Sequence, residues 1–367
     1  MRVVVAGGGT AGHVAPGLAL AARLRERGAD VLFVGSRSGF EAELVPAAGV
    51  PFAGIEAEPF VRGLTWRALR GPVVALATSR RVGPLLDGAD VVVGLGGYVS
   101  VPAGLAARRR RVPFVVHEQN AVPSLANRVL ARWAAAVGIS FADAAERFPA
   151  RARVERTGNP VRPQVLEVQG RRDAIAQEAR RALGLVDGLP TVLVMGGSQG
   201  ALSLDRAVAG ALPSLVGADV QLLVLTGRDH VEVVRGPAGA GPAPPTVVVG
   251  FLERIELAYA VAEFAVARAG ASAIAELAVC GIPAVLVPYP YATDDHQAAN
   301  ARELVRAGAA EVIPDAELSP SRLARCILDL MRDRDRRSAM AAAMRAWAIP
   351  DADARLAELV LEVAGRR

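Results

Sequence analysis

The stretch Gly7-Gly8-Gly9-Thr10-Ala11-Gly12-His13 lies between an apolar run, residues 3–6, and a segment with helical periodicity that begins near Val14. Strand, glycine turn and helix, in this order, direct backbone N–H groups and a helix N-terminus at an anion. The first, third and sixth residues of the stretch also fit G-x-G-x-x-G, the dinucleotide-binding fingerprint, which is weak evidence on its own. We therefore expect a parallel α/β sheet that begins here, with an anion-binding loop after its first strand.

Composition indicates a globular protein of two or three domains. The chain has 367 residues, of which 52% are hydrophobic and 22% charged. No uncharged apolar stretch reaches the roughly 18 residues that span a bilayer. The first expected strand starts two residues from the N-terminus, so we expect no signal peptide. Cys280 and Cys326 are the only cysteines, which favours reduced thiols and a cytosolic protein.

The charge pattern argues against nucleic acid as a partner and against a resident metal. The formal net charge is +5, and every basic residue is Arg. The one dense basic run is residues 108–111, and aromatic residues make up only 4%, so a basic stripe with interleaved aromatics is missing. An anionic surface or substrate is a better partner. Asp294-Asp295 and Asp333-Arg334-Asp335 lack a complementary cluster, and zinc spacings are absent, so we expect no metal site.

The first half of the chain alternates strands with helices. Apolar strands that are separated by helices predict a parallel sheet covered on both faces. A linker or hinge is expected at residues 157–163, which hold two prolines and a glycine, and a charged surface helix at residues 169–181. The expected strands are 3–6, 31–34, 91–94, 114–117 and 137–139, and the expected helices are 14–27, 40–48, 102–107 and 124–134.

The opening unit then returns half a chain later. Residues 191–195 form an apolar strand, 196–200 a glycine turn and 201–211 a helix. We infer two similar doubly wound domains whose strand ends share a ligand cleft. Pro350 breaks a C-terminal helix, and its continuation is expected to return to the first domain. Further strands are expected at 221–225, 246–249, 264–267 and 284–288, a loop at 236–245 and the last helix at 352–364.

Three loops of the first half carry candidate chemistry. His13 follows the opening glycine turn and could serve as a base or donor, or only as a cap at a helix start. Gly96 and Gly97 could bring backbone close to a ligand beside the Tyr98 hydroxyl, or form a tight turn with a buried Tyr. The run His117-Glu118-Gln119-Asn120 ends an apolar strand and suits sugar hydroxyls or acid–base work, unless it is a satisfied polar cluster.

The second half carries its own candidates. Ser198 and the N–H groups around it could hold a phosphate, although the missing Lys excludes a P-loop. Ser272 is predicted to cap a helix, and Glu276, one turn later, could accept both hydroxyls of a ribose or only favour the helix dipole. Gln297 and Asn300 share a helix face and suit sugar hydroxyls.

In combination these motifs resemble the MurG family of bacterial N-acetylglucosaminyltransferases, which belongs to glycosyltransferase family 28. Seven motifs agree in order and spacing over nearly the whole chain: residues 8–13, 94–100, 117–120, 158–162, 196–200, 268–276 and 295–300. Ala11 and His296 depart from the residues common in the family. The resemblance implies two Rossmann-like domains facing a cleft, the B-type glycosyltransferase fold. An acceptor and membrane-facing domain would comprise residues 1–161 and 350–367, and a donor domain residues 162–349.

The resemblance also implies roles for individual residues toward UDP-N-acetylglucosamine as donor. Arg162 and Ser198 would contact the diphosphate, Leu252 the uracil through its backbone, Glu276 the ribose and Gln297 the N-acetylglucosamine. Other donor contacts would come from Thr10, Ala11, Gly12, Asn120, Ala271, Ser272, Ala273, Ile274 and Ala275. Contacts to the acceptor would come from Gly9, Gly96, Gly97 and Tyr98.

The implied reaction transfers N-acetylglucosamine to the C4 hydroxyl of N-acetylmuramic acid in lipid I, the undecaprenyl-diphosphate-linked muramyl pentapeptide, and yields lipid II for peptidoglycan. The family implies inversion, no obligatory metal and no cofactor. His13 and Glu118 are both candidates for the base. A lipid acceptor implies a peripheral position on the cytoplasmic face of the membrane, and a cell-wall or division complex is a possible partner. Residues 60–86, with Trp66 and several Arg, suit an interfacial patch or an ordinary amphipathic helix.

Three other functions remain open at this point. An NAD-dependent oxidoreductase needs an acid after the second strand, but residues 35–38 hold none, and Arg37 would at best favour NADP. Another nucleotide-sugar transferase or an epimerase could share the fold. A scaffold that binds a nucleotide sugar without catalysis is the remaining alternative.

Overall fold

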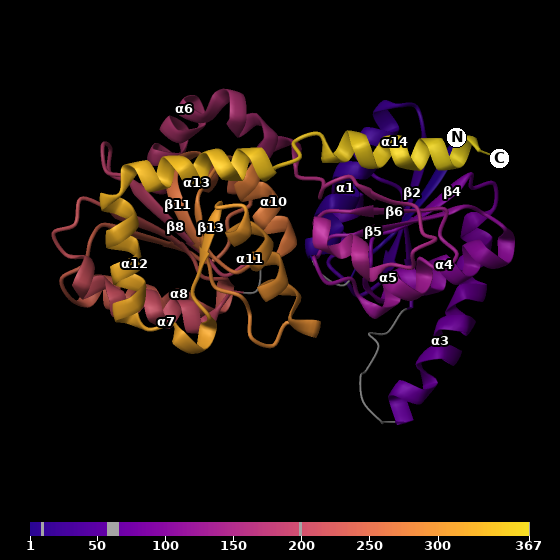
Figure 1. Cartoon of the computed structure of the whole chain (residues 1–367), viewed down its shortest axis with the longest axis horizontal. Helices are drawn as coiled ribbons and strands as arrows, with labels where there is room; N and C mark the ends of the chain where they lie inside the picture. Colours follow the sequence, from indigo (N-terminus) through magenta and orange to yellow (C-terminus); the bar gives the residue numbers. More distant parts are fainter. Residues whose placement is uncertain (9–10, 57–65, 198–199, 367) are drawn as a thin grey trace. The chain divides into compact units, whose positions relative to one another are not determined.

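The computed structural model describes residues 1–8, 11–56, 66–197 and 200–366, with backbone only for residues 11 and 66–73 (Figure 1). The chain divides into two compact units. Unit 1 comprises Met1–Arg162 and Ile349–Arg367, and unit 2 comprises Pro163–Ala348. Each unit is an α/β structure built on its own parallel sheet, so the fold class expected from the sequence is confirmed.

The sheet of unit 1 has seven parallel strands in the order β3-β2-β1-β4-β5-β6-β7. Its central strands β1 and β4 are apolar apart from Arg2 at the start of β1, because helices cover both faces. The order reverses at β1 and β4, so the carboxyl ends of these two strands lie at the topological switch point, where ligands bind in open α/β sheets. The strands are β1 (Arg2–Ala6), β2 (Asp30–Ser36), β3 (Phe52–Ile55), β4 (Val91–Gly94), β5 (Phe114–Glu118), β6 (Ala136–Ile139) and β7 (Val154–Arg156).

Successive residues of a strand pack against opposite helical layers of unit 1. Val3 and Val5 of β1 pack with α1, α2 and α14, whereas Val4 and Ala6 pack with the layer that contains α4 and α5. The helices are α1 (Ala11–Glu26), α2 (Glu41–Ala47), α3 (Trp66–Val82), α4 (Gly97–Arg110), α5 (Leu125–Leu130) and α14 (Ala352–Gly365), with short turns η1 (Gly83–Leu86) and η2 (Ala142–Arg147).

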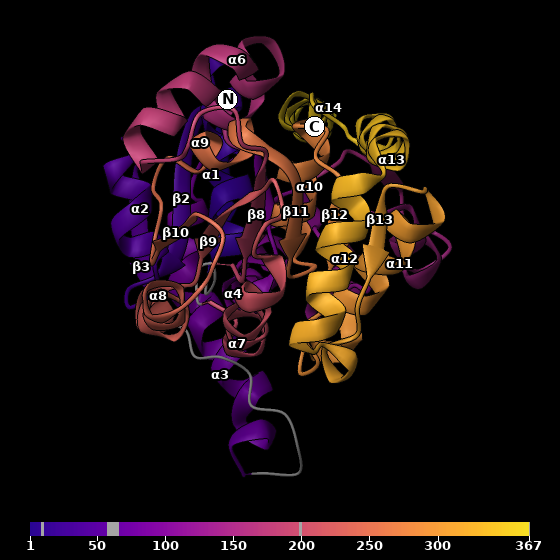
Figure 2. The same ribbon diagram turned by 90° about the vertical axis from the view of Figure 1, so that its left-hand side faces the viewer.

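The sheet of unit 2 has six parallel strands in the order β10-β9-β8-β11-β12-β13. Val192 and Val194 of β8 pack with α7, α8 and α12 in one core; Figure 2 shows these three helices with the sheet. Elsewhere in unit 2, α6 packs against α9, and α10 packs against α13. The strands are β8 (Thr191–Met195), β9 (Gln221–Leu225), β10 (Thr246–Val249), β11 (Ala262–Ala267), β12 (Ala284–Leu286) and β13 (Ala310–Val312).

The helices of unit 2 are mostly longer than its strands. They are α6 (Pro163–Leu183), α7 (Leu202–Ala211), α8 (Val231–Ala240), α9 (Ile255–Val261), α10 (Ala271–Val279), α11 (His296–Arg306), α12 (Pro320–Arg332) and α13 (Arg334–Trp347). Short turns are η3 (Leu212–Leu215), η4 (Arg228–His230), η5 (Thr293–Asp295) and η6 (Asp315–Glu317).

The last helix returns to unit 1, as expected. The break at Pro350 separates α13 from α14, and α14 lies beside α1 (Figure 1). Nε of Arg23 on α1 donates to Oδ2 of Asp353 at 2.8 Å, and Nη1 of Arg153 donates to Oε1 of Glu362 at 3.1 Å. These pairs hold the final helix at both of its ends.

Several local predictions were wrong. The expected loop at 236–245 is helical up to Ala240, with Pro237 inside α8. Helix α4 begins at Gly97, five residues before the expected start at Pro102. Strands β3, β7 and β13 were missed; β7 and β13 each contain charged residues, and β3 contains a glycine.

Candidate active site

The loops after β1 and β4 meet at the carboxyl edge of the unit 1 sheet. Gly96 and Gly97 have φ of +91° and +73°, and a side chain at Gly97 would lie 2.7 Å from the carbonyl oxygen of Gly8. The ring of His13 approaches this turn so closely that a side chain at Gly96 would lie 3.2 Å from its Nε2 atom. Glycine is therefore required at both positions, and His13, Gly96 and Gly97 do lie together as the sequence predicts.

Ser100 fixes this turn to the first strand. Its hydroxyl is buried and lies 2.7 Å from the carbonyl oxygen of Gly96 and 3.1 Å from that of Ala6. Tyr98 is half-buried and packs against the core between the sheet and α4. The Tyr98 ring thus contributes to packing and is also partly accessible. Gly9 and Thr10 lie outside the described residues, Ala11 begins α1, and Gly12 is exposed.

His117 is a structural member of the polar run that ends β5. Its ring is completely buried, with Nε2 2.9 Å from the carbonyl oxygen of Gly158 and Nδ1 3.0 Å from the amide nitrogen of Gln119. Since a carbonyl only accepts, the proton resides on Nε2, and Nδ1 accepts from Gln119. Burial lowers the pKa of His117 to about 4. His117 is therefore neutral and holds the strand end in place.

Glu118 is buried and its carboxylate accepts from several donors. Oε1 accepts from the backbone N–H of Asn120 at 2.9 Å, and Oε2 accepts from the N–H of Ser124 at 3.1 Å and the amide of Asn127 at 2.8 Å. Burial raises the pKa of Glu118, and these hydrogen bonds oppose that increase. Such a carboxylate is well suited to organising the loop that carries Asn120.

Two buried side chains of this edge were missed at the sequence level. Asn127 bridges the Glu118 carboxylate and the carbonyl of His117, and it lies on α5, outside any recognisable motif. Glu41 accepts from the N–H of Ser36 at 2.8 Å, and a side chain at Gly8 would collide with its carboxylate. An acid thus does follow β2, although Glu41 is completely buried and cannot reach a ribose hydroxyl.

In unit 2, the loop after β8 repeats the glycine geometry. Gly197 and Gly200 have φ of +87° and +76°, and a side chain at Gly200 would lie 2.1 Å from the carbonyl oxygen of Thr226. The loop leads into α7, and the N-terminus of a helix directs backbone N–H groups at an anion. Ser198 lies outside the described residues.

The start of α10 differs from the prediction in one respect. Gly270, not Ser272, occupies the N-cap position, because Ser272 is already inside the first helical turn. Glu276 is mostly buried and accepts a hydrogen bond of 2.7 Å from the hydroxyl of Tyr259. Tyr259 was not predicted, since it lies on α9, seventeen residues earlier in the chain. Ser272 and Ala273 are half-buried, whereas Ala271, Ile274 and Ala275 are buried.

The two amides expected to share a helix face have different surroundings. Oε1 of Gln297 accepts from the N–H of Tyr289 at 2.9 Å, so its amide nitrogen is the group that it can offer a ligand. Asn300 is completely buried and donates to the carbonyl oxygen of Ala269 at 3.0 Å. Asn300 therefore positions the loop before α10, and the expectation that it meets sugar hydroxyls is wrong.

Arg268 joins the ends of several elements in unit 2. Its guanidinium donates to Oδ1 of Asp315 at 2.6 Å, to the hydroxyl of Ser203 at 2.7 Å and to the carbonyl of Val287 at 3.1 Å. It also lies 5.5 Å from the centre of the Tyr289 ring.

Arg162 and Leu252, both expected at the donor site, are half-exposed, and Leu252 follows β10.

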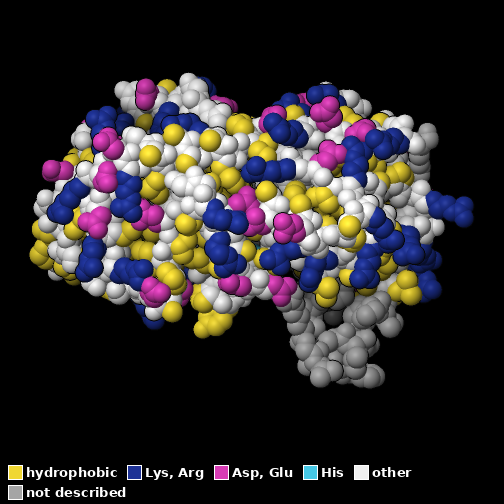
Figure 3. All heavy atoms as spheres, viewed as in Figure 1, with side chains coloured by type: hydrophobic (Ala, Val, Ile, Leu, Met, Phe, Trp, Pro, Cys, Tyr) yellow, Lys and Arg dark blue, Asp and Glu magenta, His cyan; other side chains and the backbone are white. Residues whose placement is uncertain are grey.

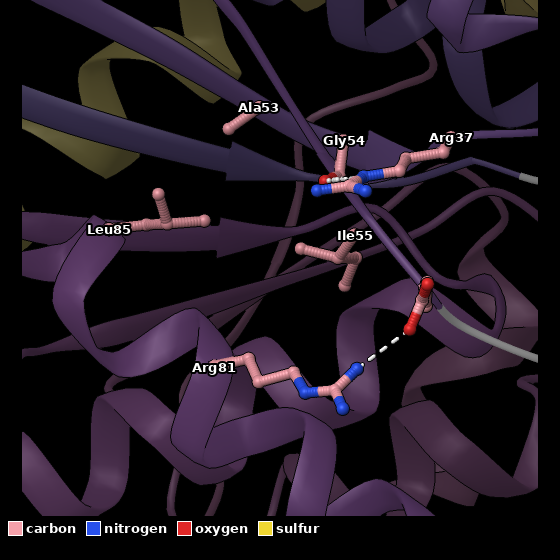
Figure 4. Close-up of a pocket in the computed structure, with 7 residues that line it drawn as sticks. Arg37, Ala53, Gly54, Ile55, Arg81 and Leu85 are labelled. Carbon is pink, nitrogen blue, oxygen red and sulfur yellow. Dashed lines mark hydrogen bonds and ion pairs between the residues drawn. The ribbon is translucent and has the colours of Figure 1, made fainter.

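A cavity of about 590 Å³ lies in unit 1 beside β3 and α3, at a place that no motif indicated (Figure 4). Nε of Arg37 donates to the carbonyl of Gly54 at 2.9 Å, and Arg81 pairs with Glu56 at 2.7 Å. The cavity is lined by apolar and charged residues of both signs: Arg37, Ala53, Gly54, Ile55, Glu56, Arg81 and Leu85.

Basic and acidic side chains are interspersed over the described surface that Figure 3 shows. Among the described residues, no cluster of three His, Cys, Asp or Glu side chains has the arrangement of a metal site. Within the same residues, no helix is both long and apolar enough to cross a bilayer.

Comparison with known proteins settles the family. Residues 3–139 match the N-terminal domain of glycosyltransferase family 28, and residues 191–356 match its C-terminal domain. The chain belongs to glycosyltransferase family 28. The two matches cover the edges described above in unit 1 and in unit 2, so the resemblance inferred from the sequence is confirmed.

Relatives of similar length share one name. A protein of Acidothermus cellulolyticus is 44% identical over all of this chain and 99% of its own length. A protein of Halorhodospira halophila is 42% identical over 99% of this chain and 98% of its own. Both are named UDP-N-acetylglucosamine–N-acetylmuramyl-(pentapeptide) pyrophosphoryl-undecaprenol N-acetylglucosamine transferase.

Solved structures agree with the family. The crystal structure of MurG from Acinetobacter baumannii is 30% identical over 98% of this chain and 99% of its own, with a TM-score of 0.79. The UDP-N-acetylglucosamine 2-epimerase of Neisseria meningitidis has a TM-score of 0.68 at 14% identity, over 99% of this chain and all of its own. The second likeness shows the fold alone.

Proposed function

We propose that this chain transfers N-acetylglucosamine from UDP-N-acetylglucosamine to the C4 hydroxyl of N-acetylmuramic acid in lipid I. The observation that carries the proposal is the match, over essentially the whole chain, to relatives named for this transfer. The polar and glycine-rich strand ends of both units give the proposal its chemistry.

The donor is assigned to unit 2. Glu276, held by the Tyr259 hydroxyl, accepts the ribose hydroxyls, and Leu252 offers backbone to the uracil. The loop after β8, with Ser198 and the start of α7, binds the diphosphate, and Gln297 contacts the sugar through its amide nitrogen. The remaining donor contacts come from Thr10, Ala11, Gly12, Asn120, Arg162 and residues 271–275.

The acceptor is assigned to unit 1, with Gly9, Gly96, Gly97 and Tyr98 as its contacts. The C4 hydroxyl oxygen forms a bond to the anomeric carbon while the bond from that carbon to the UDP oxygen breaks, which inverts the configuration. UDP leaves with the bonding electron pair, and Arg162, Ser198 and the α7 N-terminus stabilise its charge. The hydroxyl proton passes to a base.

His13 is the better candidate for that base. Its half-buried ring lies against Gly96 at the edge where we place the acceptor. Glu118 faces inward to Asn120, Ser124 and Asn127 instead. We therefore assign Glu118 to positioning the loop and His13 to proton removal.

The acceptor lipid requires contact with the cytoplasmic face of the membrane. Val74 and Leu76 on α3 are 38% and 43% exposed, and Arg80 and Arg81 follow them on the same helix. Exposed aliphatic side chains with nearby Arg suit the interface of an anionic membrane. We propose that α3 makes this contact.

A transfer assay tests the proposal. Labelled UDP-N-acetylglucosamine and a lipid I analogue should yield a labelled disaccharide lipid, and Glu276→Ala should lose activity through weaker donor binding. Binding of the nucleotide sugar without any transfer would instead indicate a scaffold. Transfer to another acceptor but not to lipid I would indicate a different transferase, and binding of NADPH in place of the nucleotide sugar would indicate an oxidoreductase.

A further inference from the structure

His230 stands between two ligand-side loops of unit 2. It ends η4, the turn that follows β9. A side chain at Gly200, in the loop after β8, would lie 2.9 Å from the Nδ1 atom of His230. A side chain at Gly250, directly after β10, would lie 3.3 Å from Cα of Arg228 in the same turn. The turn that carries His230 is thus packed against two loops: the loop after β8, which is assigned to the diphosphate, and the loop after β10, which is assigned to the uracil.

Asp205 fixes the orientation of the imidazole. It lies in the first turn of α7 and is only 1% exposed, and its Oδ2 atom lies 3.1 Å from Nδ1 of His230. A carboxylate only accepts, so Nδ1 carries the proton. The ring is one-quarter exposed. Because Nδ1 is directed at the buried carboxylate, Nε2 is the polar atom that His230 can present to a ligand.

The buried carboxylate needs an explanation beyond packing. Burial raises the pKa of Asp205 to about 6, and Oδ1 has no hydrogen-bond partner among the described residues. The loop after β8 has no cationic side chain of its own, since residues 196–201 contain neither Lys nor Arg.

Other charged groups near His230 are engaged elsewhere. Arg268 is bound to Asp315 and Ser203, Arg228 lies over the Phe251 ring, and Glu232 on α8 pairs with Arg235. Asp229 precedes His230 in its own turn. Asp205 is thus the acid directly bonded to the imidazole among the described residues.

We propose that His230 is a phosphate-binding residue of the nucleotide-sugar site and that Asp205 is its positioning residue. This inference rests on the proposed donor site in unit 2. As an imidazolium, with a proton on each ring nitrogen, His230 donates through Nδ1–H to Asp205 and through Nε2–H to an oxygen of the diphosphate. When the anomeric carbon–oxygen bond breaks, the electron pair goes to that diphosphate, and the bond from Nε2–H strengthens without proton transfer.

Asparagine and glutamine at position 230 separate the two roles of the ring. In His230→Asn the amide nitrogen takes the place of Nδ1 and keeps the bond to Asp205, but nothing replaces Nε2. In His230→Gln the longer amide reaches the place of Nε2. We expect His230→Asn to keep wild-type thermal stability and uridine affinity, while its affinity for UDP falls about 10- to 100-fold. His230→Gln should recover part of this loss, because its neutral amide N–H replaces the donor but not the charge.

Calorimetry with UDP and with uridine decides the matter. Wild-type UDP affinity in His230→Asn overturns the proposal, and so does an equal loss of UDP and uridine affinity in that variant. Asp205→Asn keeps an acceptor for Nδ1–H without its charge, and should weaken UDP binding alone; unchanged UDP binding overturns the role of Asp205. These measurements need no acceptor, so a failure of transfer to lipid I refutes the proposed reaction without touching this result.

Discussion

Nε2 of His117 lies 2.9 Å from the carbonyl oxygen of Gly158, and this hydrogen bond joins the end of β5 to the segment that leaves unit 1. Gly158 has a φ of +81°, and a side chain there would lie 2.8 Å from Cβ of Ile349, where the chain returns to the unit. The hydrogen bond and the packing of Ile349 at Gly158 therefore connect the polar edge of the sheet to the two segments where the chain leaves unit 1 and returns to it. We expect a hinge at the adjacent residues 159–163.

This bond predicts an acid-sensitive unit 1. Burial lowers the pKa of His117 to about 4, whereas an unfolded His titrates near 6.5. The unfolded chain binds the extra proton first, so stability is complete above about pH 6.5 and is lost as the pH falls toward 4. The loss from this group amounts to about 3 kcal/mol. The free energy of unfolding can be measured by urea titration at several pH values between 4 and 7. Its decrease with falling pH should be smaller for His117→Gln than for wild type.

The comparison needs a second histidine as its control. His296 lies at a partly exposed helix start, with Nδ1 2.8 Å from the carbonyl oxygen of Thr293. His296→Gln should retain the wild-type dependence on pH. If the free energy of unfolding of wild type and His117→Gln depended on pH in the same way, the assignment of a neutral, buried His117 would be contradicted.

Glu118→Gln should destabilise the protein by about 3 kcal/mol. Both carboxylate oxygens accept from donors, so either orientation of the new amide sets an N–H group against a donor. Asn127→Ala should cost a similar amount, and the double variant should cost less than the sum because the two residues share one network. Thermal or urea unfolding measures each value. A stable Glu118→Gln protein without turnover would instead identify Glu118 as the base.

The fold was largely predictable, because long apolar strands and glycine turns are local signals. The order of β1, α1, β8 and α7 follows directly from the two repeated glycine turns. Short strands such as β7, Val154–Arg156, carry little apolar pattern of their own and form because a neighbouring strand pairs with them. Their existence is decided by tertiary context, which no short window of sequence contains.

The loops of the candidate site were predictable from the sequence, but the side chains that position the site residues were not. His13, Gly96 and Gly97 belong to motifs, and the structure does bring them together. Asn127, Tyr259 and Asp205 act through contacts to residues 9 to 25 positions away in the chain, and none of the three is part of a recognised motif. Asn300 looked like a ligand contact because its burial could not be seen in the sequence.

His13→Ala should lower kcat about 100-fold or more, with a change of less than about threefold in KM for the nucleotide sugar. The reason is that a base acts on the acceptor hydroxyl and contributes little to donor binding. Steady-state kinetics with a lipid I analogue measures both constants. Unchanged turnover would remove His13 from the chemistry, and a rise in KM alone would make it a donor contact.

Tyr259→Phe should raise KM for the nucleotide sugar by about tenfold and leave kcat nearly unchanged. The variant removes the hydroxyl that donates to Oε2 of Glu276 at 2.7 Å, so the carboxylate loses one of the contacts that hold it for the ribose. Tyr291→Phe serves as the control, because that ring is 82% exposed. Equal effects of the two substitutions would show that Glu276 does not depend on Tyr259.

Membrane binding provides the last test, through the exposed aliphatic residues of α3. Val74 and Leu76 are 38% and 43% exposed, and moving both into a lipid interface contributes about 1.5 kcal/mol, or roughly tenfold in affinity. Val74→Glu with Leu76→Glu should therefore reduce binding to anionic vesicles by at least tenfold, with solution activity on a short-chain acceptor retained. Val216→Glu in unit 2 is a matched control, since Val216 is 49% exposed outside α3. Because Arg80 and Arg81 add an electrostatic component, added salt should weaken wild-type binding. Equal vesicle binding by the double variant and wild type would exclude α3 as the contact.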